Sequence, residues 1–235
     1  MDGSGKRVIA IGALASVWLS VAWALHGASW AFVASFAVLF AGGTLIASFG
    51  SGWAVLDRWP NRVTAVRFSL VAWVAGGWLG EWSVALWAFS LLALGLDGVD
   101  GWLARRLDQS SRFGARFDME VDAFFIMVLS LLCWRLTDAG PWVLAMGALR
   151  YLWVGASWPA PALTTPLPPS VFRKTVCVVQ LLALLYALLP GGAVPYGVVV
   201  LAVSLGLLFV SFARDAIWCF FRAPHTATVA VLKRP

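Results

Sequence analysis

The stretch LDGVDGWLARRLDQSSRFGARFDMEVDAFF, residues 96–125, contains the pattern that decides the fold of this chain. Asp97 and Asp100 are three residues apart, and Asp118 and Asp122 are four residues apart. Because residues at these spacings share one face of an α-helix, each pair predicts a carboxylate-bearing helix face. The short connection between the pairs predicts two antiparallel neighbouring helices whose acidic faces point at one another.

Four carboxylates placed in this way are expected to hold divalent metal. Two like charges 4 Å apart repel by about 4 kcal/mol at an effective dielectric constant near 20, and a divalent cation removes that penalty. Ligands that are all oxygen favour Mg²⁺, Mn²⁺ or Ca²⁺ over zinc. The alternative, acids solvated at a membrane surface, is the interpretation that we favour for Asp108. Glu120 is left out of the predicted site because it lies about 200° around the helix from Asp118.

The rest of the sequence is typical of an integral membrane protein. Of its 235 residues, 61% are hydrophobic and 12% are charged, which is too apolar for an ordinary soluble domain of this length. A spanning helix needs roughly 20 mainly apolar residues. We therefore predict an all-α, polytopic membrane bundle of eight transmembrane helices, at about 8–25, 30–48, 62–80, 83–104, 115–136, 141–158, 171–189 and 195–218.

The distribution of basic residues supports this topology. Four alternate connections, 26–29, 81–82, 137–140 and 190–194, contain no lysine or arginine. Positive charge favours the cytoplasmic side, so both termini and the aspartate pairs are predicted to lie there, with the protein in the plasma (inner) membrane. The net charge of +6 is then mainly a topology signal, and no nucleic-acid binding is predicted. The basic residues at the predicted cytoplasmic ends are Lys6, Arg7, Arg58, Arg62, Arg105, Arg106, Arg112, Arg116, Arg173, Lys174, Arg214, Arg222, Lys233 and Arg234.

The sequence divides into three parts without any internal repeat. Residues 1–50 are predicted to form an accessory transmembrane hairpin, because its two apolar cores contain no charged residue. Residues 51–220 form the predicted catalytic core, and residues 221–235 a cytoplasmic tail. The proline-rich segment 159–170 predicts a non-helical connection within the core.

Two glycines and an arginine add to the acidic pattern. Gly101 directly follows Asp100, and each of Gly101 and Gly114 permits close approach of a ligand because it lacks a Cβ atom. Gly114 also begins a predicted helix, where free N–H groups favour phosphate. Arg105 can form a bidentate contact with a diphosphate.

These positions together resemble a known signature. The pattern Asp97-x-x-Asp100-Gly101-x-x-Ala104-Arg105, eight further residues, then Gly114-x-x-x-Asp118-x-x-x-Asp122 is similar to that of the CDP-alcohol phosphotransferases at every fixed position. The six predicted spans from about 62 to 218 resemble the family's six-helix core. Pro60-Asn61-x-x-Thr64-x-x-Arg67 resembles the segment that opens this core, whereas the first two spans depart from the minimal family pattern.

The resemblance implies a reaction and a set of roles. An acceptor hydroxyl attacks the β-phosphorus of a CDP-linked donor, and CMP leaves. The four aspartates are expected to bind two metal ions, Mg²⁺ or Mn²⁺, and Asp122 is expected to act also as the general base. The residues expected at the donor nucleotide are Asn61, Thr64, Arg67, Gly101, Ala104, Arg105, Gly114 and Asp118.

Four basic residues are candidates for binding the acceptor. Arg150 lies in the middle of a predicted span, where arginine is costly and indicates either a substrate or partner-helix contact or a structural ion pair. Arg173 and Lys174 resemble a basic element before the family's fifth core helix, and Arg214 a basic position in its last one. The alternative is that these residues only enforce topology; if they form a pocket, the acceptor carries negative charge.

The leading hypothesis is a phosphatidyltransferase of phospholipid biosynthesis that uses CDP-diacylglycerol and a polar alcohol acceptor. An alternative enzyme would transfer a headgroup from a soluble CDP-alcohol to a lipid hydroxyl, and the signature does not separate the two. A cation or proton transporter is a different class, but it should show polar groups through both leaflets and often repeats. A non-catalytic scaffold has no need of clustered carboxylates. Membrane lipids are expected partners, and a homodimer is expected only by analogy with the family.

Overall fold

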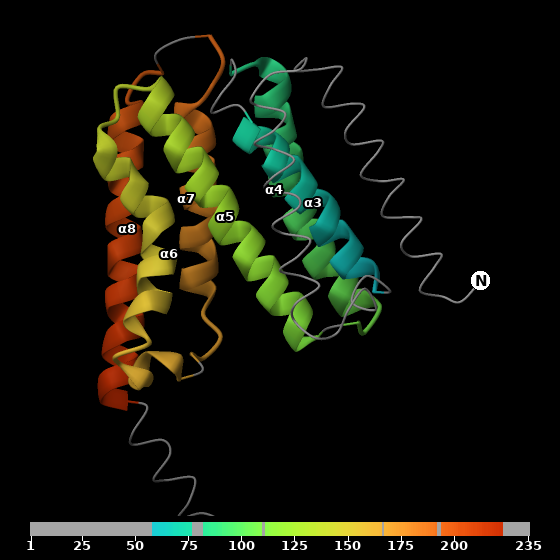
Figure 1. Ribbon diagram of the computed structural model, residues 1–235, viewed down its shortest axis with the longest axis vertical. Helices are drawn as coiled ribbons and strands as arrows, with labels where there is room; N and C mark the ends of the chain where they lie inside the picture. The colour runs from blue at the N-terminus through green and yellow to red at the C-terminus, as the bar shows by residue number, and fades with distance from the viewer. Residues whose placement is uncertain (1–57, 77–81, 110, 166, 192–193, 223–235) are drawn as a thin grey trace, which may run out of the picture. The chain divides into compact units, whose positions relative to one another are not determined.

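The described part of the chain is entirely helical. The computed structural model describes residues 58–76, 82–109, 111–165, 167–191 and 194–222 (Figure 1). These residues contain no strand, which confirms the all-α prediction for this part of the chain. Their α-helices are α3 (Trp59–Gly76), α4 (Val84–Arg106), α5 (Arg112–Leu136), α6 (Leu144–Ala156), α7 (Val171–Ala187) and α8 (Gly197–Ile217).

These six helices coincide within a few residues with the six spans predicted after residue 57. Two helical stretches, Val84–Arg106 and Gly197–Phe221, are long and apolar enough to cross a membrane by length and composition. The first two predicted spans, the hairpin 1–50 and most of the tail 221–235 lie outside the described residues.

Serine side chains mark where three of the helices begin. Ser83, Ser111 and Ser170 precede α4, α5 and α7, and each hydroxyl accepts a hydrogen bond from the backbone N–H three residues later. The donor–acceptor distances are 3.4, 2.9 and 3.3 Å, respectively. Such caps satisfy N–H groups that have no partner inside the helix, so these boundaries follow from local sequence.

The proline-rich connection differs from the prediction in one respect. Segment 159–170 was expected to be non-helical, but Pro161–Thr164 forms a short 3₁₀-helix. Proline is tolerated in the first turn of a helix because the N–H group that it lacks has no partner there. A similar turn at Pro141–Val143 leads into α6.

The chain divides into two compact units, Met1–Val128 and Leu129–Pro235. Within the first unit, α3 lies beside α4 and beside the first part of α5 (Figure 1). Trp73 of α3 packs edge-on against Phe89 of α4, with ring centroids 5.5 Å apart. Phe68 of α3 faces Phe124 of α5 at 5.9 Å. These aromatic contacts fix α3 against the two helices that carry the aspartates.

The second unit contains the end of α5 together with α6, α7 and α8. Gln180 is buried in the middle of α7 and donates a hydrogen bond to the Met146 carbonyl of α6 at 3.0 Å. Val199, Val203 and Val210 of α8 are all more than half exposed. A helix that exposes so many apolar side chains requires an apolar environment, as expected for a lipid-facing surface.

Candidate active site

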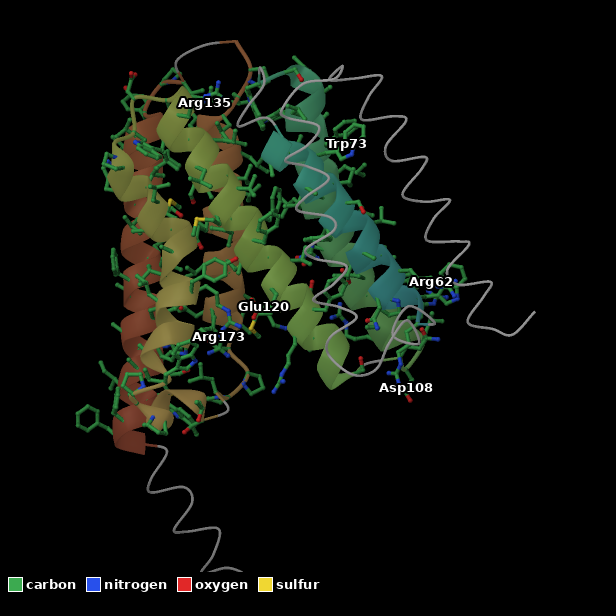
Figure 2. The ribbon with its side chains drawn as sticks, viewed as in Figure 1. Arg62, Trp73, Asp108, Glu120, Arg135 and Arg173 are labelled. Atoms are coloured by element: carbon green, nitrogen blue, oxygen red, sulfur yellow. The ribbon has the colours of Figure 1, made fainter. Side chains whose placement is uncertain are left out.

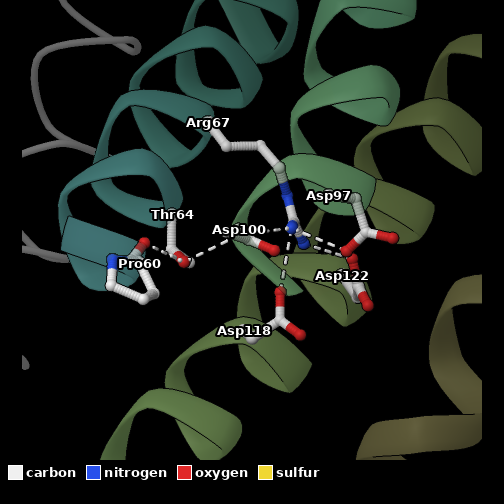
Figure 3. A network of polar contacts seen from close by, with 7 residues as sticks. All are labelled: Pro60, Thr64, Arg67, Asp97, Asp100, Asp118 and Asp122. Atoms are coloured by element: carbon white, nitrogen blue, oxygen red, sulfur yellow. Dashed lines mark hydrogen bonds and ion pairs between the residues drawn. The ribbon is translucent and has the colours of Figure 1, made fainter. Parts of the chain in front are cut away.

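The four aspartates of the signature converge on one buried arginine (Figure 3). Asp97 and Asp100 come from α4, Asp118 and Asp122 from α5, and Arg67 from α3. The Nη1 atom of Arg67 donates to Asp97, Asp118 and Asp100 at 2.7, 2.8 and 3.2 Å, respectively, and Nη2 donates to Asp122. The predicted meeting of the two acidic helix faces is therefore observed, with a guanidinium at its centre.

The cluster has a sealed side and an open side. The Arg67 side chain is 1% exposed and the Asp100 side chain 4%. The side chains of Asp97, Asp118 and Asp122 are 30, 39 and 23% exposed, respectively. A ligand can therefore reach three of the carboxylates, while the arginine lies behind them in the protein.

The donor set fits a divalent cation. Carboxylate oxygens of Asp97, Asp100 and Asp118 lie within 4.8 Å of one another. Four ionised carboxylates and one guanidinium leave the cluster with a formal charge of −3. Since hard divalent cations prefer oxygen ligands, these carboxylates could hold a divalent cation.

Thr64 connects the opening segment of the core to the aspartates. Its hydroxyl lies 2.9 Å from Asp100 Oδ2 and 3.1 Å from the Pro60 carbonyl, one turn earlier in α3 (Figure 3). Thr64 and Arg67 thus contact the same buried carboxylate from one helix face. Both were expected at the donor nucleotide, and both are placed in contact with the carboxylate cluster.

The missing Cβ of Gly114 makes room for a protein side chain. A Cβ atom built there would lie 2.7 Å from Asn61 Oδ1 and 3.0 Å from Ser111 Oγ. Asn61 is buried, so the start of α5 can approach α3 only because residue 114 is a glycine. The Gly114 N–H donates to Ser111 at 2.9 Å, which leaves it unavailable as the free phosphate donor expected from the sequence.

The other signature positions lie along the end of α4. A Cβ at Gly101 would have Arg105 Nη1 as its nearest neighbour, at 3.6 Å, which is ordinary contact. Arg105 is exposed, so its guanidinium is accessible to a ligand. The carbonyl of Ala104 accepts a hydrogen bond from the Gln109 N–H at 3.1 Å, which closes the end of the helix. Glu120, which was excluded from the predicted site, is exposed on α5 (Figure 2).

Two of the candidate acceptor residues, Arg173 and Arg214, contact residues of the second unit as follows. Arg173 forms an ion pair with Asp215 at 3.0 Å and donates to the Pro168 carbonyl at 2.9 Å. Arg214 donates to Ser170 Oγ at 2.6 Å and stacks over the Phe172 ring at 4.7 Å.

Lys174 is exposed at the start of α7, and Arg150 is half-buried in α6. Arg173, Lys174 and Arg214 therefore lie at the α7 start and the α8 end, which the Arg173–Asp215 ion pair joins.

Sequence reasoning missed three residues that organise these contacts. Ser111 could have been found as a helix cap, because a serine shortly before a predicted helix is a capping signal. Asp215 could have been found as an acid beside Arg214 at the end of an apolar span. Gln109 lies in the variable part of the signature and gave no sequence signal.

Comparison with known proteins agrees with the signature. The family described as CDP-alcohol phosphatidyltransferase matches residues 58–210 of the chain. A curated protein of Mycobacterium bovis and two of Mycobacterium tuberculosis strains, each named "Putative cardiolipin synthase", are 31% identical over 108 residues. The match covers 40% of this chain and 50% of each relative, so the chain spans about half the length of these relatives.

No solved structure matches the chain significantly. The family match covers well over half of the chain and includes all four aspartates and Arg67. Its members are membrane-embedded transferases. This chain belongs to the CDP-alcohol phosphatidyltransferase family.

Proposed function

We propose that this protein is an integral membrane transferase of phospholipid biosynthesis that moves a phosphatidyl group from CDP-diacylglycerol to the hydroxyl of a polar alcohol, with release of CMP. The observation that carries the proposal is the convergence of Asp97, Asp100, Asp118 and Asp122 around Arg67. Family membership supports the reaction class, and the name of the mycobacterial relatives supports a phospholipid product.

The four aspartates are proposed to hold a pair of Mg²⁺ or Mn²⁺ ions. Bound metal would supply charge neutralisation at the attacking and leaving oxygens of a phosphoryl transfer. The partly exposed carboxylates of Asp97, Asp118 and Asp122 offer oxygen atoms for this. Buried Asp100, whose carboxylate lies near those of Asp97 and Asp118, is oriented by Thr64. Arg67 lies on the sealed side of the cluster and keeps the carboxylates close together before substrate arrives.

Asp122 is proposed as the general base. The acceptor oxygen forms a bond to the phosphorus of the diacylglycerol phosphate, and the bond from that phosphorus to the CMP oxygen breaks. The acceptor proton passes to a carboxylate oxygen of Asp122, while the electron pair of the broken bond leaves with CMP. The donor nucleotide is proposed to lie against Asn61, Gly101, Ala104, Arg105 and Asp118. Thr64 and Arg67 are proposed to act there through Asp100, and Gly114 through the space that it leaves for Asn61.

An anionic acceptor is proposed to bind at Arg173, Lys174 and Arg214, with Arg150 as a further contact. Asp215 neutralises part of the charge of Arg173. Lys174 and Arg214 are both exposed, so they are the cations most available to a phosphate. A phosphorylated glycerol, either free or within phosphatidylglycerol, has the charge that such a pocket requires.

The membrane arrangement is also part of the proposal. Eight spans would place both termini and the aspartates at the cytoplasmic face of the plasma membrane, with residues 1–50 as an accessory hairpin and 51–220 as the catalytic core. The exposed apolar face of α8 and the apolar length of α4 support membrane insertion of this core. A homodimer is proposed by analogy with the family.

The test is transfer by purified protein in mixed micelles with CDP-diacylglycerol and Mg²⁺ or Mn²⁺. The acceptor panel contains glycerol phosphate, phosphatidylglycerol, inositol and inositol phosphate, and both CMP and lipid product are followed. We expect metal-dependent CMP release with one of the phosphorylated acceptors, which should be lost in EDTA and restored by Mn²⁺.

A parallel arm supplies CDP-ethanolamine or CDP-choline with diacylglycerol. Product in that arm alone would replace the proposal by headgroup transfer to a lipid hydroxyl. Equal CMP release after complete chelation would refute the assignment of the aspartates as metal ligands. Activity on inositol alone, with none on phosphorylated acceptors, would refute the anionic acceptor pocket.

A further inference from the structure

Gln109 lies in the loop between α4 and α5 and uses three polar groups to join it to its neighbours. Its N–H donates to the Ala104 carbonyl at the end of α4 at 3.1 Å. Its side-chain oxygen Oε1 accepts from the Trp59 N–H at 3.0 Å. Its backbone carbonyl accepts from Arg58 Nη1 at 3.2 Å. One loop residue therefore ties the end of α4 to the start of α3.

The contact with Trp59 solves a local problem of α3. The first N–H groups of a helix have no partner within it, and Arg58, which precedes α3, is not a residue type favoured as a helix cap. The Gln109 amide accepts from the first N–H of the helix, from a position 50 residues away in the chain. It therefore caps α3 from another part of the fold.

The capped end of α3 is the end that enters the site. The Asn61 side chain occupies the space that a Cβ atom at Gly114 would need, and one turn later Thr64 contacts Asp100. A shift of the α3 start along its axis would move both contacts. Since Asn61 and Thr64 belong to the proposed donor nucleotide site, a residue that fixes the start of α3 should affect binding of the donor.

We propose that Gln109 is a positioning residue: its side-chain oxygen holds the start of α3 in register with the aspartate helices and so shapes the donor nucleotide site. This inference rests on the proposed function for the identity of the donor. Gln109 falls in the eight-residue interval between Arg105 and Gly114, where the signature fixes no residue type. The role follows from the three hydrogen bonds of this chain.

The variants separate the acceptor oxygen from the bulk of the side chain. Gln109→Leu removes the oxygen but keeps most of the side-chain volume. Gln109→Ala removes both. Gln109→Glu keeps an oxygen at the same place, and its negative charge suits a helix N-terminus. Asp108→Asn is the matched loop control, because Asp108 is exposed and asparagine tolerates its positive φ of 49°.

Two measurements are made on the full-length protein in micelles. The first is the KM for CDP-diacylglycerol against kcat, and the second is hydrogen exchange of the peptide covering residues 58–66. We expect Gln109→Leu and Gln109→Ala to raise KM and accelerate exchange in this peptide by about five-fold, the factor for one net hydrogen bond. We expect kcat to stay within about two-fold of wild type in all variants. In Gln109→Glu and Asp108→Asn we expect KM and the exchange rate to stay within about two-fold as well, because neither variant loses a contact to α3.

The outcomes are decisive in each direction. Unchanged exchange in both Gln109→Leu and Gln109→Ala would overturn the cap, and faster exchange with unchanged KM would overturn the positioning role. If Gln109→Glu behaved like Gln109→Leu, the oxygen would not be the group responsible. Failure of the wild type to release CMP from CDP-diacylglycerol would instead refute the proposed function, while the exchange experiment would still test the cap.

Discussion

Replacing Arg67 with methionine removes the guanidinium that contacts all four aspartates and keeps a side chain of similar length. Arg67 is fully buried, so no water molecule at the surface can take over its role. Arg67→Lys is the companion variant, because it keeps the positive charge but cannot form several directed hydrogen bonds at once. Arg106→Met is the control, since Arg106 is exposed on α4 and stacks on Trp102 at 5.0 Å.

The expected magnitude follows from the distances in the cluster. Two carboxylates 4.8 Å apart repel by roughly 3.5 kcal/mol at an effective dielectric constant of 20, so the three closest aspartates repel by about 10 kcal/mol in total. A guanidinium about 4 Å from each of these three carboxylates returns about 4 kcal/mol per pair, about 12 kcal/mol in total, which offsets this repulsion. Without Arg67 the protein relieves the repulsion by moving or protonating carboxylates, and removal of one partner from a buried ion pair typically destabilises by about 3–5 kcal/mol.

The assay is unfolding in detergent micelles, followed by the fluorescence of the 15 tryptophans. In EDTA, Arg67→Met should be less stable than wild type by about 3–5 kcal/mol, Arg67→Lys intermediate, and Arg106→Met within about 0.5 kcal/mol. Mn²⁺ at a hundred times the wild-type Kd adds about 2.7 kcal/mol to the stability of the wild type, if it binds only the folded protein. At the same Mn²⁺ concentration the gain should be larger for Arg67→Met, because its carboxylates lack an internal cation and bind metal more tightly, so Mn²⁺ should narrow the stability gap.

Two results would refute this reasoning. If Arg67→Met were as stable as wild type in EDTA, the guanidinium would not be the charge that holds the aspartates together. If the difference in stability between wild type and Arg67→Met were the same with and without Mn²⁺, bound metal would not replace the charge of Arg67 at these carboxylates. Because unfolding is the readout, both conclusions hold whatever the substrate is.

Three further substitutions test the site. Asp122→Asn should lower the rate of CMP release by about 10²–10⁴-fold, as expected for loss of a general base; near-normal turnover would remove Asp122 from that role. Gly114→Ala should destabilise by roughly 1–3 kcal/mol, because overlap with Asn61 outweighs the gain of about 1 kcal/mol in helix propensity; a stabilised variant in a denaturation experiment would contradict the 2.7 Å contact. Thr64→Val should destabilise by about 1.5–3 kcal/mol by removing a donor from the buried Asp100 carboxylate, and a neutral result in the same experiment would show that Asp100 finds another donor.

Local patterns predicted most of what the structure describes. The spans expected after residue 57 coincide with α3 to α8, because apolar length and flanking polar residues determine where these helices begin and end. The pairing of Asp97 with Asp100 and of Asp118 with Asp122 follows from helical spacing alone. The convergence of the two pairs followed from the short loop between their helices.

What the sequence did not predict depends on contacts between distant segments. Arg67 was expected beside a nucleotide because the motif that contains it opens the family's core, whereas its guanidinium lies among the four carboxylates. Gly114 was expected to admit a ligand, whereas Asn61 occupies the adjacent space. No periodic sequence pattern indicates either contact, because each joins residues that lie on different helices.

The two sequence motifs of this chain that resemble the family's signature contact one another directly. The first, on α3, has no carboxylate, and the second, on α4 and α5, has no buried cation among its described side chains. Thr64 of the first motif forms a hydrogen bond with Asp100 of the second. Asn61 of the first motif occupies the space that a Cβ atom at Gly114 would need. Because residues in direct contact have non-additive effects, neither motif can be assigned a separate share of nucleotide binding or metal binding. The position of α3 therefore affects the geometry of the proposed catalytic site. A contact that fixes this position, such as the hydrogen bond from the Trp59 N–H to the Gln109 side chain, should affect activity as well as stability.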